Sequence, residues 1–323
     1  MSDAGRRNGR ARRWNVHELP PQDGRTFLVT GGASGIGYFI AEQLAGTGAT
    51  VILAGRDSAR AELARQAIRT RVPGTRLRTF VLDLADLESV RKAADGLSAS
   101  LGRLDGLILN AGLTAQPERR ETVDGNELVF GTNHLGHFVL AASLYPLLAR
   151  TTGSRIVTMG SVAARLADLD FDDLQAVRPP YKGFRTYGRS KLAQMVLASE
   201  LDRRLRDTGS PVASVLAHPG GALDGLTPSR PPLHVRTATG FLGALPKAPV
   251  AQSKEHAAWP AVRAALDPLA EGGQLWGPRF LRGRGRPVRE KPFAKMTDPQ
   301  VGERLWSATE RVAGMGWPLG DGG

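Results

Sequence analysis

The chain contains no cysteine, and this absence excludes disulfide bonds, thiolate metal sites and cysteine nucleophiles. Long apolar runs are also absent, because no segment approaches the roughly 20 residues that span a bilayer, and the N-terminus lacks the apolar block of a secretory signal. We therefore expect a cytoplasmic protein without a membrane span. The six histidines lack the spacing of a metal site, so no bound metal is expected.

The first informative pattern is a short strand followed by glycines and a helix. Residues 26–30 form the apolar run of a strand covered on both faces, and apolar side chains recur at helical spacing from residue 38 to 44. Glycines between them allow left-handed dihedrals and close approach of a ligand, and free amides at a helix start favour an anion. We predict a pyrophosphate site, with an ordinary strand-to-helix turn as the alternative, at Gly31, Ser34, Gly35, Ile36 and Gly37.

Further short apolar runs follow at regular intervals. They predict strands at 49–54, 77–82, 106–109, 155–159, 213–217 and 272–278, separated by helical patterns. This alternation is typical of an α/β fold. We predict a doubly wound, Rossmann-type parallel sheet of about seven strands with helices on both faces, as one domain over residues 23–323.

The residues after the second strand bear on the choice of nicotinamide cofactor. In a βαβ dinucleotide fold this position faces the adenosine ribose, where an acidic side chain accepts from a free 2′-hydroxyl. Arg56 instead offers a fork of donors to a 2′-phosphate. We therefore favour NADP, with NAD as the alternative. A purely structural role is also open, in which Arg56 caps a turn and Asp57 starts the next helix.

Several motifs resemble the short-chain dehydrogenase/reductase family. The glycine spacing is followed, in the family's order, by Asn110-Ala111-Gly112 after the fourth strand, Asn133 in a helix, Ser161 after the fifth strand, and Tyr187 four residues before Lys191. The set covers roughly residues 25 to 225. The stretch Asn-His-Leu-Gly-His-Phe at 133–138 and the extra residues at 168–173 resemble the retinol dehydrogenase-like and protochlorophyllide reductase-like branches.

The resemblance implies roles for particular residues. Asp83 would contact the adenine amino group, with a helix N-cap as its structural alternative, and Asn133 would bend its helix and hold a water beside Lys191. His134 and His137 are expected to be packing or surface residues rather than metal ligands. Cofactor contacts are further expected from Leu84, Asn110, Ala111, Gly112, Tyr187, Lys191, Pro219 and Gly220.

Tyrosine and lysine four apart share one helix face, so the ammonium can stabilise a phenolate. The resemblance implies that Tyr187 exchanges a proton with the substrate oxygen, that Ser161 orients this oxygen, and that Lys191 lowers the tyrosine pKa and binds the nicotinamide ribose. Asn133 would connect Lys191 to solvent. Tyr181 has no lysine four residues later and is rejected, and Ser161 as a nucleophile lacks a histidine and acid partner.

One departure from the family follows the sixth strand. Where relatives often carry a threonine that touches the carboxamide, this chain has Gly221-Ala222-Leu223-Asp224, which puts that contact in doubt. Residues 221–252 are rich in Pro, Gly and Thr and are predicted to form a substrate lid. We predict an NADP-preferring oxidoreductase for a small alcohol or carbonyl substrate, compatible with a homo-oligomer. The alternative is a dinucleotide-sensing protein without turnover.

The net charge of +12 invites a nucleic-acid interpretation, but only seven of the 43 basic residues are lysines. Genomic base composition alone can produce such an arginine excess, so no nucleic-acid partner is expected. Two arginine clusters stand out. Residues 1–22 are predicted to be a mobile basic tail, with a phosphate-binding arm as the less favoured alternative. Residues 279–289 are predicted to be a surface loop, with a place near the cofactor or a subunit contact as the alternative.

Overall fold

A computed structural model describes residues 14–319 and contains one eight-stranded sheet in the order β3-β2-β1-β4-β5-β6-β7-β8. Strands β1 to β7 are parallel, and β8 is antiparallel to β7. The predicted doubly wound sheet is confirmed, and its parallel part has the seven strands expected. The strands are β1 Thr26–Thr30, β2 Thr50–Gly55, β3 Arg76–Val81, β4 Gly106–Leu109, β5 Arg155–Met159, β6 Ala213–Ala217, β7 Leu275–Phe280 and β8 Arg284–Glu290.

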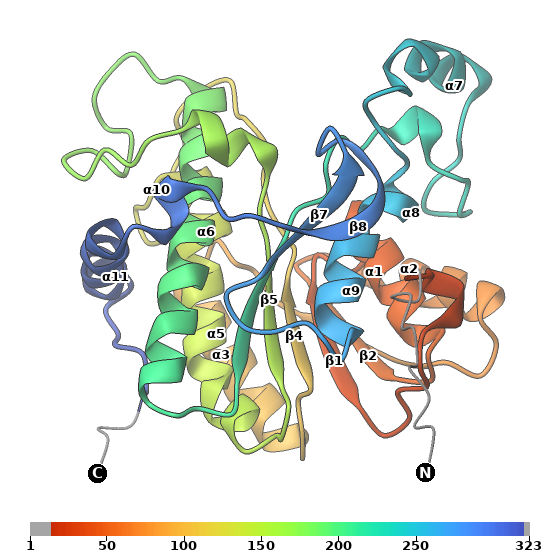
Figure 1. The fold of residues 1–323 in the computed structure, drawn as a ribbon, viewed down its shortest axis with the longest axis horizontal. Helices are drawn as coiled ribbons and strands as arrows, with labels where there is room; N and C mark the ends of the chain where they lie inside the picture. The colour runs from red at the N-terminus through yellow and green to blue at the C-terminus, as the bar shows by residue number, and fades with distance from the viewer. Residues whose placement is uncertain (1–13, 320–323) are drawn as a thin grey trace, which may run out of the picture.

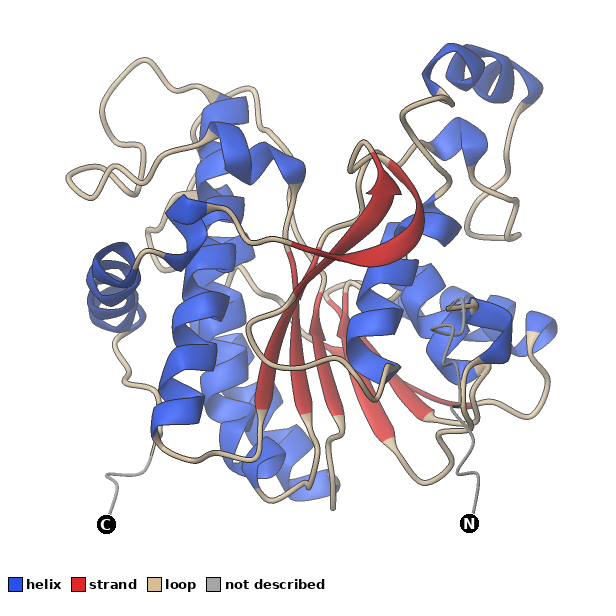
Figure 2. Cartoon of the chain, viewed as in Figure 1, coloured by secondary structure: helices blue, strands red, loops and turns tan. Residues whose placement is uncertain are grey.

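Helices cover both faces of the sheet (Figure 1, Figure 2). One face packs against α1 Gly35–Ala45, α2 Ser58–Arg71 and α9 Trp259–Leu266. The other face packs against α3 Leu87–Ser100, α5 Gly136–Ala149, α6 Gly183–Asp207 and α11 Pro299–Ala313. Shorter helices are η1 Val16–Glu18, α4 Leu128–Phe130, the π-helix η2 Gly131–Leu135, η3 Val162–Leu166, η4 Asp224–Leu226, α7 Ala238–Ala244, η5 Leu245–Lys247, α8 Lys254–Ala257 and α10 Ala294–Thr297.

Burial on both faces explains the continuous apolar runs of the central strands. All five residues of β1 are buried, whereas the edge strand β3 exposes most of its side chains. In a parallel sheet covered by two helix layers, neither face of a central strand meets water, so apolar side chains need not alternate with polar ones. The carboxyl ends of β1 to β7 consequently meet at one edge of the sheet, where ligands bind in this architecture.

The second arginine cluster is not the loop that the sequence predicts. Residues 275–280 and 284–290 form a β-hairpin, β7 and β8, whose turn places Leu281 and Arg282 at positive φ values of 47° and 53°. Arg282 pairs with Glu290 on β8 at 2.9 Å. The interleaved Gly and Pro suggested a loop, but pairing with β7 satisfies the backbone of β8, and charged side chains on this edge strand oppose pairing with another chain.

The predicted lid, residues 221–252, contains the short helices η4, α7 and η5 rather than irregular chain alone. Arg230 ties it to the body of the protein, because its guanidinium contacts both carboxylate oxygens of Glu42 on α1 at 2.9 Å and also Glu255 at 2.9 Å. In Figure 1, α7 stands above the carboxyl edge of the sheet, beside the β7–β8 hairpin.

The predicted N-terminal tail extends to residue 22, but its last part is packed. Trp14 lies in edge-to-face contact with Trp259 at 6.0 Å between ring centroids, and Gln22 is buried. Residues 1–13, which carry the first arginine cluster, lie outside the described residues. Within residues 14–319, no helix is both long and apolar enough to cross a bilayer.

Candidate active site

A cavity of about 570 Å³ opens at the carboxyl edge of the sheet, where β1, β2 and β4 end. It brings together residues that are far apart in the sequence. Most of the predicted cofactor-binding residues line it: Gly31, Ser34, Gly35, Ile36, Arg56, Asp83, Leu84, Asn110, Ala111, Gly112, Tyr187, Lys191 and Pro219. Four predicted site residues, Gly37, Asn133, Ser161 and Gly220, are not part of this lining.

The glycine turn between β1 and α1 needs its glycines for two reasons. Gly31 has a φ of +65°, and a Cβ there would lie 3.0 Å from the Cα of Ala111. A Cβ on Gly37 would overlap the carbonyl oxygen of Gly31. Gly37 therefore lets α1 pack against the turn instead of facing the cavity, which explains why it is absent from the lining.

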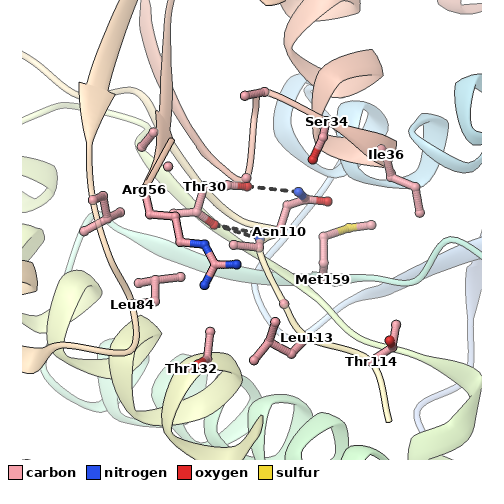
Figure 3. A pocket seen from close by; sticks show the side chains of 18 of the residues that line it. Thr30, Ser34, Ile36, Arg56, Leu84, Asn110, Leu113, Thr114, Thr132 and Met159 are labelled. Atoms are coloured by element: carbon pink, nitrogen blue, oxygen red, sulfur yellow. Dashed lines mark hydrogen bonds between the residues drawn. The ribbon is translucent and has the colours of Figure 1, made fainter. Parts of the chain in front are cut away.

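Thr30, at the end of β1, holds this turn against the end of β4 (Figure 3). Its Oγ1 accepts from the backbone amides of Asn110 at 2.9 Å and Ala111 at 3.0 Å, and the Asn110 side chain donates to the Thr30 carbonyl at 2.9 Å. These hydrogen bonds hold the glycine turn after β1 against the Asn110-Ala111-Gly112 turn after β4. Sequence reasoning missed Thr30 as a site residue, although its place immediately before the first glycine was a usable signal.

Arg56 extends from the end of β2 into the cavity (Figure 3), and Arg60 from the first turn of α2 lines it too. Asp57 caps α2 by accepting from the amide of Arg60 at 2.9 Å, so its predicted structural role is confirmed. Asp83 also lines the cavity, but it is not a helix N-cap, because Asp86 caps α3 by accepting from the amide of Ser89 at 2.9 Å.

Tyr187 and Lys191 lie one turn apart on α6, and both line the cavity. Lys191 is 5% exposed, and its ammonium donates to the Met159 carbonyl at 3.0 Å and to Oε1 of Gln194 at 2.8 Å. Burial lowers the pKa of Lys191 to about 8. No carboxylate of the described residues forms an ion pair with it, so the ammonium is held by neutral acceptors alone.

Two tyrosines near the site differ in their surroundings. Tyr181 donates its hydroxyl hydrogen to Glu127 at 3.0 Å, and burial together with that carboxylate raises its pKa to about 12. Tyr187 is half-buried at the cavity, and its hydroxyl makes no hydrogen bond to residues 14–319. Its phenol is therefore available to a bound molecule, whereas that of Tyr181 is engaged.

Asn133 is fully buried and lies in the π-helix η2. The helix is therefore irregular at the residue that was expected to bend it. Its Oδ1 accepts from the amide of Leu113 at 2.7 Å, and its Nδ2 donates to the Leu113 carbonyl and to Ser190 Oγ, both at 3.0 Å. These bonds fix the chain just after Asn110-Ala111-Gly112. The carbonyl of Asn133 is within 2.8 Å of the ring nitrogen Nδ1 of His137.

Ser161 caps the helix η3, with Oγ accepting from the amide of Ala163 at 3.2 Å. The side chain is half-buried. This hydrogen bond leaves the hydroxyl hydrogen available as a donor, which is the role the sequence predicts for it.

His134 and His137 are buried packing residues, as predicted. Nε2 of His134 lies 2.8 Å from Thr309 Oγ1, and Nε2 of His137 lies 2.9 Å from Thr30 Oγ1. Burial lowers the pKa of each to about 3, so both rings are neutral at physiological pH. Among residues 14–319 there is no group of three or more side chains suited to hold a metal ion.

The cavity also contains residues that sequence reasoning did not single out. Lys254, from the start of α8, lines it and forms an ion pair with Asp224. Asp224 itself is not part of the lining, so the carboxylate that raised doubt about cofactor binding lies outside the cavity. The other unpredicted lining residues are Thr30, Ala33, Ala54, Gly55, Asp57, Arg60, Leu82, Leu113, Thr114, Thr132, Met159 and Gly160. Gln194, which contacts Lys191 without lining this cavity, could have been found from its helical spacing to Lys191, whereas Lys254 had no local signal.

Comparisons with known proteins agree with this geometry. A family model described as short chain dehydrogenase matches residues 25–230. The chain is 39% identical over 308 residues to mouse polyprenol dehydrogenase, covering 94% of this chain and 88% of the relative. It is 35% identical over 300 residues to human retinol dehydrogenase 13, covering 91% and 86%. A crystal structure of an uncharacterised protein from Mycobacterium paratuberculosis superposes with a TM-score of 0.77 at 34% identity, covering 95% and 99%.

Proposed function

This chain belongs to the short-chain dehydrogenase family of oxidoreductases, in its retinol dehydrogenase-like branch, and from that membership we propose an NADP-preferring enzyme that interconverts an alcohol and a carbonyl compound, with Tyr187 as general acid and base. One observation carries the proposal. Tyr187 and Lys191 face the same cavity as the glycine turn, so an acid–base pair and a phosphate-binding turn share one site.

The residues present suit a dinucleotide. The cavity is bounded by the start of α1, where unpaired amides attract a phosphate, and by Gly31 and Gly112, which allow close approach to the backbone. A Cβ on Gly112 would lie 3.1 Å from Oδ1 of Asn133 and 3.5 Å from Nζ of Lys191. When bound, a nicotinamide ring supplies or accepts a hydride at the substrate carbon.

NADP is favoured over NAD because cations dominate the end of β2. Arg56 and Arg60 both line the cavity there, and their guanidinium groups suit a 2′-phosphate. Asp57, an acid that also lines the cavity and could accept from a free 2′-hydroxyl, already accepts from the amide of Arg60 through Oδ1. The site thus offers donors where a second phosphate would sit.

In this proposal Tyr187 donates a proton to the carbonyl oxygen during reduction and removes it from the alcohol during oxidation. A free phenol has a pKa of about 10, so about 4 kcal/mol of preferential stabilisation brings the phenolate within reach at neutral pH. The ammonium of Lys191 is the nearby positive charge that can favour the phenolate. Ser161 donates its hydroxyl hydrogen to the substrate oxygen, and Asn133 acts as a positioning residue that holds the segment beginning at Leu113.

The substrate proposed is a largely apolar alcohol or aldehyde. Large apolar side chains are exposed next to both reactive residues: Val162 adjoins Ser161, and Phe184 lies three residues before Tyr187 on α6. The names of the related polyprenol and retinol dehydrogenases also point to apolar alcohols.

The test is turnover of apolar alcohols and aldehydes with both cofactors, followed by nicotinamide absorbance. Tyr187→Phe should reduce the rate by at least about 10²-fold and leave cofactor binding intact. Tyr181→Phe is the matched control and should retain activity. Cofactor binding without turnover, unaffected by Tyr187→Phe, would favour the dinucleotide sensor and overturn the enzyme proposal.

A further inference from the structure

A second cavity of about 300 Å³ adjoins the cofactor cavity. Both share Ser34 and Gly35 at the start of α1, Arg60 on α2, and Lys254 on α8. The shared residues place Lys254 at the phosphate end of the site, because α1 begins at Gly35 and a dinucleotide of this fold seats its pyrophosphate there.

Lys254 and Asp224 form an ion pair, but the two face different spaces. Lys254 lines both cavities, whereas Asp224 lines only the second one. The carboxylate therefore neutralises the ammonium from the side away from the cofactor cavity. A negative charge facing the cavity itself would repel a phosphate.

A series of hydrogen bonds determines how Lys254 and Asp224 approach each other. The amide of Lys254 donates to Thr227 Oγ1 at 3.0 Å, and Thr227 Oγ1 donates to the Leu223 carbonyl at 2.8 Å. The amide of Leu223 donates to the Gln252 carbonyl at 3.0 Å. The start of the lid and the start of α8 are thus joined, and Lys254 is held at the rim of the cofactor cavity.

The ion pair is of the weak, solvent-exposed kind. The side chain of Asp224 is 66% exposed and that of Lys254 is 26% exposed, so water screens their attraction. A pyrophosphate carries more negative charge than one carboxylate and offers several acceptor oxygens. Exchange of the carboxylate for the phosphate is therefore favourable for the ammonium.

We propose that Lys254 is a ligand for the cofactor pyrophosphate, supplied by α8, and that Asp224 holds its ammonium in place until the dinucleotide binds. This inference rests on the proposed function, because it requires a dinucleotide in the cavity. It gives a physical account of the departure from the family at residues 221–224. Asp224, in the segment where relatives often carry a threonine that touches the carboxamide, here serves to hold a lysine from a later segment.

The experiment measures the dissociation constants of NADPH and NADH from cofactor fluorescence, without substrate. Lys254→Gln should weaken both about tenfold, because one charge-assisted contact is lost. Lys247→Gln replaces an exposed lysine of the preceding lid segment that lines neither cavity, and it should change neither dissociation constant. Asp224→Asn should not weaken the binding of either cofactor, because its amide oxygen can still accept from Lys254 and only the competing negative charge is removed. Thermal unfolding of each variant shows that the fold is intact.

Three results would overturn the inference. Unchanged affinity in Lys254→Gln would show that the ammonium does not touch the cofactor. Equal weakening of cofactor binding by Asp224→Asn and Lys254→Gln would show that the ion pair only holds the lid in place. A loss of affinity confined to NADPH would show that Lys254 contacts the 2′-phosphate and not the pyrophosphate. If the unaltered protein binds neither cofactor, the proposed function fails as well; if it binds both and only the variants disagree, the failure is restricted to Lys254.

Discussion

The ammonium of Lys191 lies 2.8 Å from the carboxamide oxygen of Gln194, one turn further along α6. This contact, with the Met159 carbonyl at 3.0 Å, means that two neutral acceptors hold a nearly fully buried cation. Dipoles compensate for lost hydration less completely than a carboxylate does, which is why burial lowers the pKa of Lys191 to about 8. Gln194 is therefore a positioning residue for Lys191, the lysine to which the proposed function gives a catalytic role.

Substitution of Gln194 should shift the pH dependence of the enzyme. Gln194→Leu removes an acceptor and lowers the pKa of Lys191 further, so cofactor binding should weaken at a lower pH than in the unaltered protein. Gln194→Glu places a carboxylate beside the ammonium and should move the profile to higher pH. The measurement is the dissociation constant of NADPH against pH for the three proteins. Identical profiles would contradict a role for Gln194 in holding Lys191.

Lys191 also makes stability depend on pH. An unperturbed lysine has a pKa of 10.5 and Lys191 has a pKa of about 8, so between these values the unfolded chain binds a proton that the folded chain does not. Stability should therefore rise as the pH increases through this range. Relative to Lys191→Met, which does not titrate, the gain should be at most about 3 kcal/mol. Urea unfolding of both proteins across the range measures it, and a constant difference would refute it.

Arg56 should discriminate between the two cofactors. Arg56→Ala removes the donor fork at the end of β2 and should raise KM for NADP by about tenfold or more, with little change for NAD. Arg69→Ala, an exposed arginine of the following helix α2 that does not line the cavity, is the control. Steady-state kinetics with both cofactors give the ratio. Equal losses for NADP and NAD would argue against a 2′-phosphate contact.

Arg230 should hold the lid to α1. Its side chain and that of Glu42 are 7% and 10% exposed, so Arg230→Met leaves a buried carboxylate without its cation. We expect a loss of roughly 3 kcal/mol in the free energy of unfolding and faster proteolysis within residues 231–250. Arg236→Met is the matched control, because Arg236 is an exposed arginine of the same segment. Similar behaviour of the two variants would show that the ion pair does not anchor the lid.

Local sequence patterns predicted the central architecture well. Strands β1, β2 and β4 to β6 are short apolar runs because their surroundings are apolar on both faces. Burial favours an apolar side chain at each position of such a strand, so the strand can be recognised from its sequence. The pattern failed at β8, where Arg284–Glu290 is rich in Arg, Gly and Pro. An edge strand is held by backbone hydrogen bonds to its neighbour, and these do not require a particular side-chain pattern. Its sequence therefore does not predict the strand.

The site was predictable to the extent that its residues occur in motifs. Tyr187 and Lys191 share a helix face, so their spacing alone predicted a common side. The partners of Lys191 were not predicted: Met159 comes from strand β5, distant in the sequence, whereas Gln194 lies only three residues further along α6 and was overlooked. Asp57 and Asp83 show the same limit, since both precede helices and both line the cavity, and only the structure shows that Asp57 is a helix N-cap whereas Asp83 is not.

By itself, the amino-acid sequence determined the glycine turn, the alternation of strands and helices, and the tyrosine–lysine pair, because each depends on neighbours within a few residues along the chain. Only the tertiary structure decided that Asp224 turns away from the cofactor cavity and that Lys254 lines it. Thirty residues separate these two side chains, and the position of each depends on how the lid folds back onto α1, which no local pattern encodes.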